Sequence, residues 1–160
     1  MYQTYKNRTI TPKRLAEIPF FKDLKSEYID MLYEKIQIVN VDKDTLIICE
    51  GDTTQKKMFF ILEGTVNIFR KSSSGKTELI CELSSPNFFG EMSIIDSGPR
   101  SASVEAKTDL LLAVLKWDDV KSLFDSKPEI MSYIFKNIAC ALSMRLRRLN
   151  SLYSYQMYKL

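Results

Sequence analysis

Residues 37–116 consist of short runs of alternating apolar and polar residues, and turn-forming residues separate these runs. A turn is indicated at 42–44, and a longer apolar run at 58–69 contains Gly64, which suggests a bend or bulge. In all, the region contains roughly eight such runs at intervals of about ten residues, and this spacing is typical of antiparallel sandwiches and barrels. We therefore predict a mainly β fold with flanking helices, an eight-stranded antiparallel jelly-roll-like β-barrel.

Helical patterns precede the strand region, in residues 1–36. Thr11 and Pro12 form a typical helix start, because threonine is a favourable cap and proline suits the first helical position. Pro19 then interrupts an apolar cluster, and Ser26 begins a second short helix whose apolar side chains fall on one face. We interpret this region as an N-terminal helical segment of a single domain.

Two further helices are predicted in residues 117–160, the last part of the same domain. The first ends before Pro128, because the residue before a proline avoids helical geometry, and Pro128 begins a long second helix. One stripe of the long helix has the spacing of a coiled coil, and its members are Phe135, Ala139, Leu142, Leu146, Leu149 and Tyr153. This stripe can pack on the strands or on a second copy of the chain. We favour a homodimer through residues 129–155.

The chain contains no histidine. This absence excludes histidine-based acid–base catalysis, serine–histidine triads and metal sites built on imidazole. The three cysteines, Cys49, Cys81 and Cys140, lie far apart in apolar surroundings, so they fit reduced thiols better than a disulfide framework. We therefore expect neither an enzyme nor a protein with a metal or a resident cofactor.

No apolar run is long enough to cross a membrane, and the N-terminus lacks the apolar core of a signal peptide. We therefore expect a cytoplasmic protein that does not bind a membrane. The charge is uneven, because residues 1–14 and 130–160 contain basic residues and no acidic ones. Cations late in a helix favour its dipole and are otherwise solvated, and no recognition-helix unit accompanies them. We favour a solvated surface here over a nucleic-acid interface.

Residues 88–104 bring together groups that suit a phosphate ester. Gly90 precedes a short apolar stretch at 92–95, which predicts one helical turn with exposed backbone donors at its start. Nine residues after Glu91, a Gly-Pro turn delivers Arg100 to the start of a strand, and a guanidinium matches a phosphodiester. Glu91 can accept a hydrogen bond from a ribose hydroxyl and offset part of the arginine charge. The spacing alone fits a surface ion pair equally well.

Residues 88–104 also resemble the phosphate-binding cassette of cyclic nucleotide-binding domains. This family includes catabolite-activator-like regulators, kinase regulatory subunits and gated channels. The resemblance covers about residues 15–150, and its other motifs lie at 18–24, 50–52, 58–66 and 139–149. It implies the fold of that family, with the cassette at 89–103 and the last two helices as its B and C helices. We expect a stand-alone member of the bacterial type.

The resemblance implies a role for each residue of the cassette. Glu91 would bind the ribose 2′-hydroxyl, while Arg100, with Ser101 and the Ala102 amide, would bind the cyclic phosphate. The Gly90 amide would approach the ligand closely, because glycine has no side chain. The remaining implied ligand contacts are Met92 and Ser93 in the cassette and Ile80 and Leu83 in the base pocket. The implied candidates for a lid over the base are Leu149, Leu152, Tyr153, Arg145 and Arg148, and the sequence does not distinguish among them.

These roles predict a regulatory module that binds a cyclic nucleotide, closes its C-terminal helix over the ligand and signals to a protein partner. We favour cyclic AMP over cyclic GMP because of its prevalence in the family, although a hydroxyl such as Ser101 follows the arginine in binders of both. The alternative is an interaction module that keeps the fold and has lost nucleotide binding.

Overall fold

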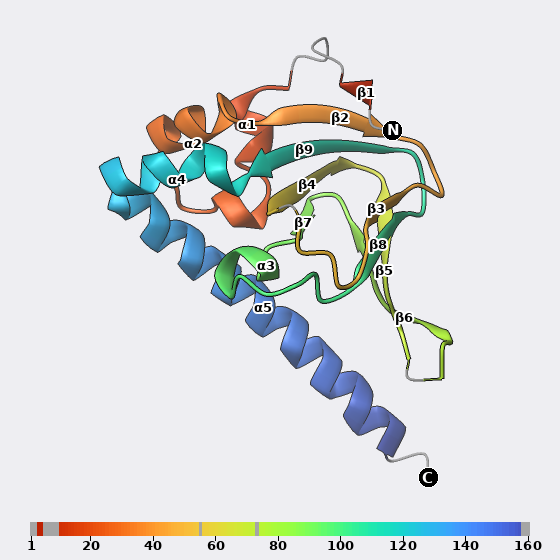
Figure 1. The fold of residues 1–160 in the computed structure, drawn as a ribbon. Coiled ribbons are helices and arrows are strands. Elements are labelled where there is room, and N and C mark those ends of the chain that lie inside the picture. The colour runs from red at the N-terminus through yellow and green to blue at the C-terminus, as the bar shows by residue number, and fades with distance from the viewer. Residues whose placement is uncertain (1–2, 5–9, 55, 73, 158–160) are drawn as a thin grey trace.

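The computed structural model describes residues 3–4, 10–54, 56–72 and 74–157 of the chain (Figure 1). Its strands form two antiparallel sheets, with the orders β1-β2-β9-β4-β7 and β3-β8-β5-β6. The strands are β1 (Gln3–Thr4), β2 (Gln37–Val41), β3 (Leu46–Ile48), β4 (Lys57–Glu63), β5 (Thr65–Lys71), β6 (Thr77–Ser84), β7 (Asn87–Phe89), β8 (Ser103–Ala106) and β9 (Leu110–Lys116).

Helices flank the two sheets (Figure 1). They are α1 (Pro12–Leu15), the 3₁₀ turn η1 (Pro19–Phe21), α2 (Ser26–Tyr33), α3 (Met92–Ile95), α4 (Trp117–Ser126) and α5 (Pro128–Met157). Thr11 occupies the N-cap position of α1, as predicted, although its side chain makes no capping hydrogen bond. None of the described helices is both long enough and apolar enough to span a membrane.

The predicted fold class is confirmed, with eight strands, β2 to β9, in residues 37–116. They form two sheets in a jelly-roll-like arrangement and do not close into one barrel. The short strand β1 is an addition, because Gln3 and Thr4 pair with Asn40 and Val39 of β2 where the sequence predicted only a helical segment.

The sheet that contains β4 is covered on both faces, and this explains the continuous apolar sequence of that strand. Met58 and Phe60 belong to a core cluster shared with the helices, whereas Phe59 and Ile61 belong to a second cluster between the sheets. Successive side chains of a strand point to opposite faces, so a strand covered on both faces needs apolar residues at every position.

The long helix α5 is fixed to the N-terminal segment through Asn137. This buried side chain donates hydrogen bonds to the carbonyl oxygens of Phe20 (3.0 Å) and Lys22 (2.6 Å). The neighbouring buried stripe of α5 consists of Ile130, Ile134, Ile138 and Ala141. Beyond this anchored half, the helix passes α3 and extends away from the sheets (Figure 1). The first half of α5 is thus part of the core, and the second half lies beside the cassette.

Candidate functional site

The cassette runs from the end of β7 through α3 to the start of β8. Gly90 follows β7 with a φ of 83°, and α3 forms the single helical turn that the sequence predicted. The sequence predicts Arg100 at the start of a strand, and this is wrong. Strand β8 begins only at Ser103, so Arg100 lies in the loop before it. The cause is the backbone of Arg100, which pairs with the loop at 51–52. Its carbonyl accepts from the Gly51 amide, and its amide donates to the Asp52 carbonyl, each at 2.9 Å.

The side chain of Arg100 is buried, with only 6% of its surface exposed. One terminal nitrogen donates to the carbonyl oxygen of Gly90 and to Ser93 Oγ, both at 2.9 Å, and the other donates to the carbonyl oxygen of Lys57 at 3.1 Å. A buried charge is tolerated only where hydrogen bonds replace its hydration, and these acceptors provide them. Ser93, implied as a ligand contact, therefore holds the guanidinium in this structure.

Two carboxylates act on Arg100 from a distance. Burial lowers the pKa of the Arg100 guanidinium, and the negative charges of Asp52 and Glu91 partly oppose that shift. The pKa of Asp52 is itself lowered, chiefly by the hydrogen bond from the Thr54 amide and then by that from the Thr54 hydroxyl. The motif at 50–52 thus acts on Arg100 in two ways. Its backbone pairs with the backbone of Arg100, and the Asp52 carboxylate stabilises the charged guanidinium.

Gly90 is required by its surroundings as well as by its backbone angle. A Cβ atom at this position would lie 2.8 Å from the carbonyl oxygen of Lys57 and 3.0 Å from the guanidinium of Arg100. Any side chain here would therefore push on the group that the cassette is built to hold.

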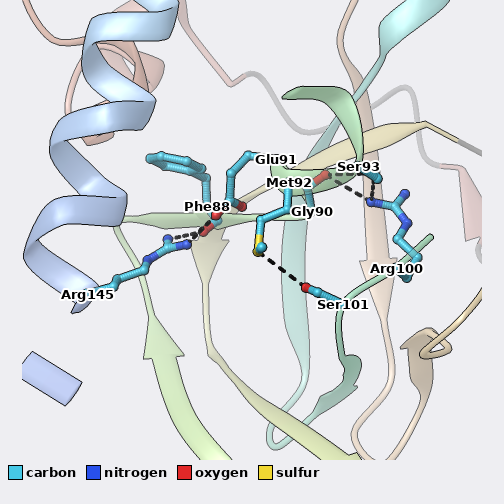
Figure 2. Close-up of polar contacts among 8 residues, drawn as sticks. All are labelled: Phe88, Gly90, Glu91, Met92, Ser93, Arg100, Ser101 and Arg145. Atoms are coloured by element: carbon cyan, nitrogen blue, oxygen red, sulfur yellow. Dashed lines mark hydrogen bonds and ion pairs between the residues drawn. The ribbon is translucent and has the colours of Figure 1, made fainter. Parts of the chain in front are cut away.

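Glu91 lies on the other side of the cassette and is only 3% exposed. Its Oε1 forms an ion pair of 2.7 Å with Arg145 of α5, whose other terminal nitrogen donates to the carbonyl oxygen of Phe88. The Arg145 guanidinium also lies over the Phe88 ring, 5.1 Å from its centroid. Figure 2 shows this network and that of Arg100 around α3. The direct partner of Glu91 is thus Arg145, and Glu91 acts on Arg100 only at longer range.

The other residues of the cassette implied as ligand contacts are open or partly open to solvent. Ser101 and Met92 are exposed, and the Ser101 hydroxyl donates to Met92 Sδ at 3.3 Å. Ala102 is half-buried beside them. Among the residues that the structure describes, no group of acidic or cysteine side chains has the arrangement of a metal site.

Strand β6 carries the residues implied for the base pocket. Ile80 is exposed, whereas Leu83 is buried in the cluster between the sheets. Sequence reasoning missed Cys81, which lies between them and is half-buried. Burial raises the pKa of the Cys81 thiol, while the positive charges of Arg145 and Arg148 oppose that shift. Cys81 of β6 is therefore within electrostatic range of Arg145 and Arg148, two of the three arginines of α5.

The five lid candidates differ in their exposure and in their contact with the cassette. Arg145 reaches the cassette, Arg148 is exposed and Leu149 is half-buried. The side chains of Leu152 and Tyr153 lie outside those that the structure describes. The helical register of α5, which the sequence does not reveal, determines that Arg145 meets Glu91.

Comparison with known proteins agrees with this geometry. The sequence pattern of the cyclic nucleotide-binding domain family matches residues 38–127. The chain is 28% identical over 137 residues to a CRP-like cAMP-activated global transcriptional regulator of Mycobacterium tuberculosis, covering 86% of this chain and 59% of the regulator. It is 34% identical to a cyclic nucleotide-gated potassium channel of Rhizobium etli, covering 76% of this chain and 32% of the channel. The chain thus spans less than two thirds of the length of each of these relatives.

A solved structure supports the same assignment. A cyclic nucleotide-binding domain from Methylobacillus flagellatus superposes with a TM-score of 0.75 at 27% identity, covering 85% of this chain and 76% of that one. The chain therefore belongs to the cyclic nucleotide-binding domain family, and the resemblance seen in the sequence is confirmed.

The environment of Gly90 predicts a large effect of Gly90→Ala on stability. The matched control is Gly75→Ala, because Gly75 has a similar φ of 79° but open space around its Cβ position. The positive φ should lower the free energy of unfolding by about 1 kcal/mol in both variants. Crowding against Lys57 and Arg100 should lower it by about 1–3 kcal/mol more in Gly90→Ala alone. Urea unfolding measures the difference, and equal losses in the two variants would contradict the tight fit.

Proposed function

We propose that this domain is a regulatory module, not an enzyme, and that it binds a cyclic nucleotide through Glu91 and Arg100. The observation that carries the proposal is a pair of buried, oppositely charged side chains, 3% and 6% exposed, held by separate networks around one turn of helix. Buried charges of this kind are rare unless they are paired or functional.

Arg100 would bind the cyclic phosphate by exchanging acceptors. Its donors are now directed at Ser93 and at the carbonyl oxygens of Gly90 and Lys57. An anionic phosphate oxygen is a stronger acceptor than a neutral carbonyl oxygen. The phosphate would therefore replace part of this network, and the Ser101 hydroxyl and the Ala102 amide would add further donors.

Glu91 would bind the ribose 2′-hydroxyl while remaining paired with Arg145. A carboxylate has two oxygens and about four lone-pair sites, and the ion pair occupies Oε1. The bond from Arg145 goes to Oε1, so the proposal assigns the ribose hydroxyl to Oε2. Arg145 would also offset the negative charge of Glu91 beside the incoming phosphate. We therefore propose Arg145 as the lid residue that joins α5 to the ligand site.

We propose cyclic AMP as the preferred ligand, in line with the name of the Mycobacterium tuberculosis regulator as cAMP-activated. Binding would shift the population toward a state in which α5 lies closed over the base. A ligand can shift this equilibrium only by its differential affinity for the closed state. The second half of α5 would pass this change to a protein partner.

The second candidate function is an interaction module that no longer binds nucleotide. One observation favours it: the protein itself already provides hydrogen-bond acceptors to both terminal nitrogens of Arg100. Ligand binding separates the two candidates, because a ligand at about a hundredfold excess over its Kd stabilises the folded state by about 2.7 kcal/mol.

Calorimetric titration with cyclic AMP and cyclic GMP tests the proposal directly. We expect the wild-type chain to bind both nucleotides, cyclic AMP more tightly, and Arg100→Ala to lose about ten- to hundredfold in affinity with the charged hydrogen bond. Arg70→Ala, which removes an exposed arginine on β5, is the control and should bind normally. If Arg100→Ala fails to fold, Arg100→Lys replaces it in the titration, because lysine keeps the positive charge. Absence of binding by the wild-type chain would favour the interaction module.

The role of Arg145 predicts a smaller loss of affinity. Arg145→Gln removes the charge that offsets Glu91, so cyclic AMP binding should weaken by about fivefold, the equivalent of about 1 kcal/mol. Arg147→Gln removes an exposed arginine two residues away on α5 and should leave the affinity unchanged. If Arg145→Gln binds more tightly, the ion pair competes with the ligand, and the assignment of Arg145 as a lid is wrong.

We also propose that α5 pairs with a second copy of the chain. Along the described part of the coiled-coil stripe, Phe135, Ala139 and Leu146 are exposed, and Leu142 and Leu149 are half-buried. A different stripe of the same helix is packed against the body of the domain. An exposed apolar stripe with this spacing is suited to another helix of the same kind.

Sedimentation equilibrium tests the pairing of α5. We expect the wild-type chain to form dimers and Leu146→Lys to shift the equilibrium to monomers. Met144→Lys is a matched control, because Met144 is 60% exposed and Leu146 is 58% exposed, but Met144 lies off the stripe. A monomeric wild-type chain, or equal effects of the two variants, would contradict the pairing.

A further inference from the structure

Met92 places an oxidisable sulfur on the solvent-exposed surface of the cassette. It is the first residue of α3, and its side chain is 42% exposed. Figure 2 shows that the side chain points away from α3 toward Ser101. The Ser101 hydroxyl donates a hydrogen bond of 3.3 Å to its sulfur. The thioether therefore holds the hydroxyl that, under the proposed function, would donate to the phosphate.

This position sets Met92 apart from the other methionines whose side chains the structure describes. Met58 is buried in the core, and Met31 and Met131 are half-buried against it. Met144 is exposed on α5, away from the cassette. Met92 is thus the described methionine that combines solvent access with a contact to a cassette residue.

Hydrogen peroxide converts a thioether to a sulfoxide in one balanced step. The sulfur lone pair attacks one peroxide oxygen, the O–O bond breaks and an S–O bond forms. The sulfur loses two electrons, the peroxide is reduced, and water leaves with both peroxide protons. A thioether is a weak hydrogen-bond acceptor, whereas the sulfoxide is polar and carries a partial negative charge on its oxygen.

We propose that Met92 is a modification site, at which oxidation to the sulfoxide lowers the affinity of the cassette for a cyclic nucleotide. The inference rests on the proposed function, because it requires the phosphate to bind beside Ser101. A sulfoxide oxygen would hold the Ser101 hydroxyl more tightly than the sulfur does now. It would also place negative charge density beside the Ser101 hydroxyl, where the proposed function places the anionic phosphate. Both effects act in the same direction.

The test compares cyclic AMP binding by each protein before and after treatment with hydrogen peroxide. Treated samples are then incubated with dithiothreitol, which reverses disulfides and sulfenic acids at Cys49 and Cys140 but leaves methionine sulfoxide in place. Mass spectrometry of the peptide that contains Met92 measures how much of the residue has gained an oxygen, with the buried Met58 as an internal reference.

We expect wild-type protein with oxidised Met92 to bind cyclic AMP about tenfold more weakly, the loss of roughly one charged hydrogen bond. Methionine sulfoxide reductase should restore the affinity. Met92→Leu should show the same affinity before and after peroxide. Met144→Leu should respond to peroxide as the wild-type protein does, because Met144 lies outside the cassette.

Two results would overturn the inference. One is an unchanged affinity in protein whose Met92 is fully oxidised. The other is an equal loss after peroxide in Met92→Leu, which would place the damage at another residue. Failure of untreated protein to bind cyclic AMP is a separate result, because it contradicts the proposed function itself and removes the site that Met92 would modify.

Discussion

The buried guanidinium of Arg100 is the constraint on which the cassette depends. A charge that is only 6% exposed must replace its hydration with hydrogen bonds, and here the acceptors come from β4, from the residue after β7 and from α3. These contacts fix Gly90, since a Cβ would crowd the guanidinium. The loop at 51–52 adds two hydrogen bonds to the backbone of Arg100. The side chain of Arg100 thus joins β4, Gly90 and α3, and its backbone joins the loop at 51–52.

The second half of the site depends on α5, which joins the cassette to the helical part of the molecule. Asn137 fixes the first half of this helix to η1 and the residue after it, and Arg145 connects its second half to Glu91. The two contacts lie on one continuous helix. A ligand that changed the Glu91–Arg145 contact would therefore act on a helix that is also hydrogen-bonded to the N-terminal segment. This connection is the reason why we propose α5 as the route from the cassette to a partner.

Much of the fold could be predicted because its signals are local. Periodicity and turn residues predict the strands. Pro12, Ser26 and Pro128 indicate the starts of helices that the structure contains. The site was predicted less completely, because its contacts depend on tertiary packing. The register of α5 brings Arg145 to Glu91, and the β6 strand brings Cys81 toward the same arginines. The loop position of Arg100 follows from pairing with residues almost fifty positions earlier, which no local pattern reveals.

The most direct test of the central claim is a crystal structure of the wild-type protein grown with cyclic AMP. The account predicts that the cyclic phosphate lies within hydrogen-bonding distance of the Arg100 guanidinium and that the ribose 2′-hydroxyl donates to Glu91. It also predicts that the Gly90 or Lys57 carbonyl has lost its bond to Arg100. A ligand bound elsewhere, with Arg100 still bonded to Gly90, Ser93 and Lys57, would contradict it.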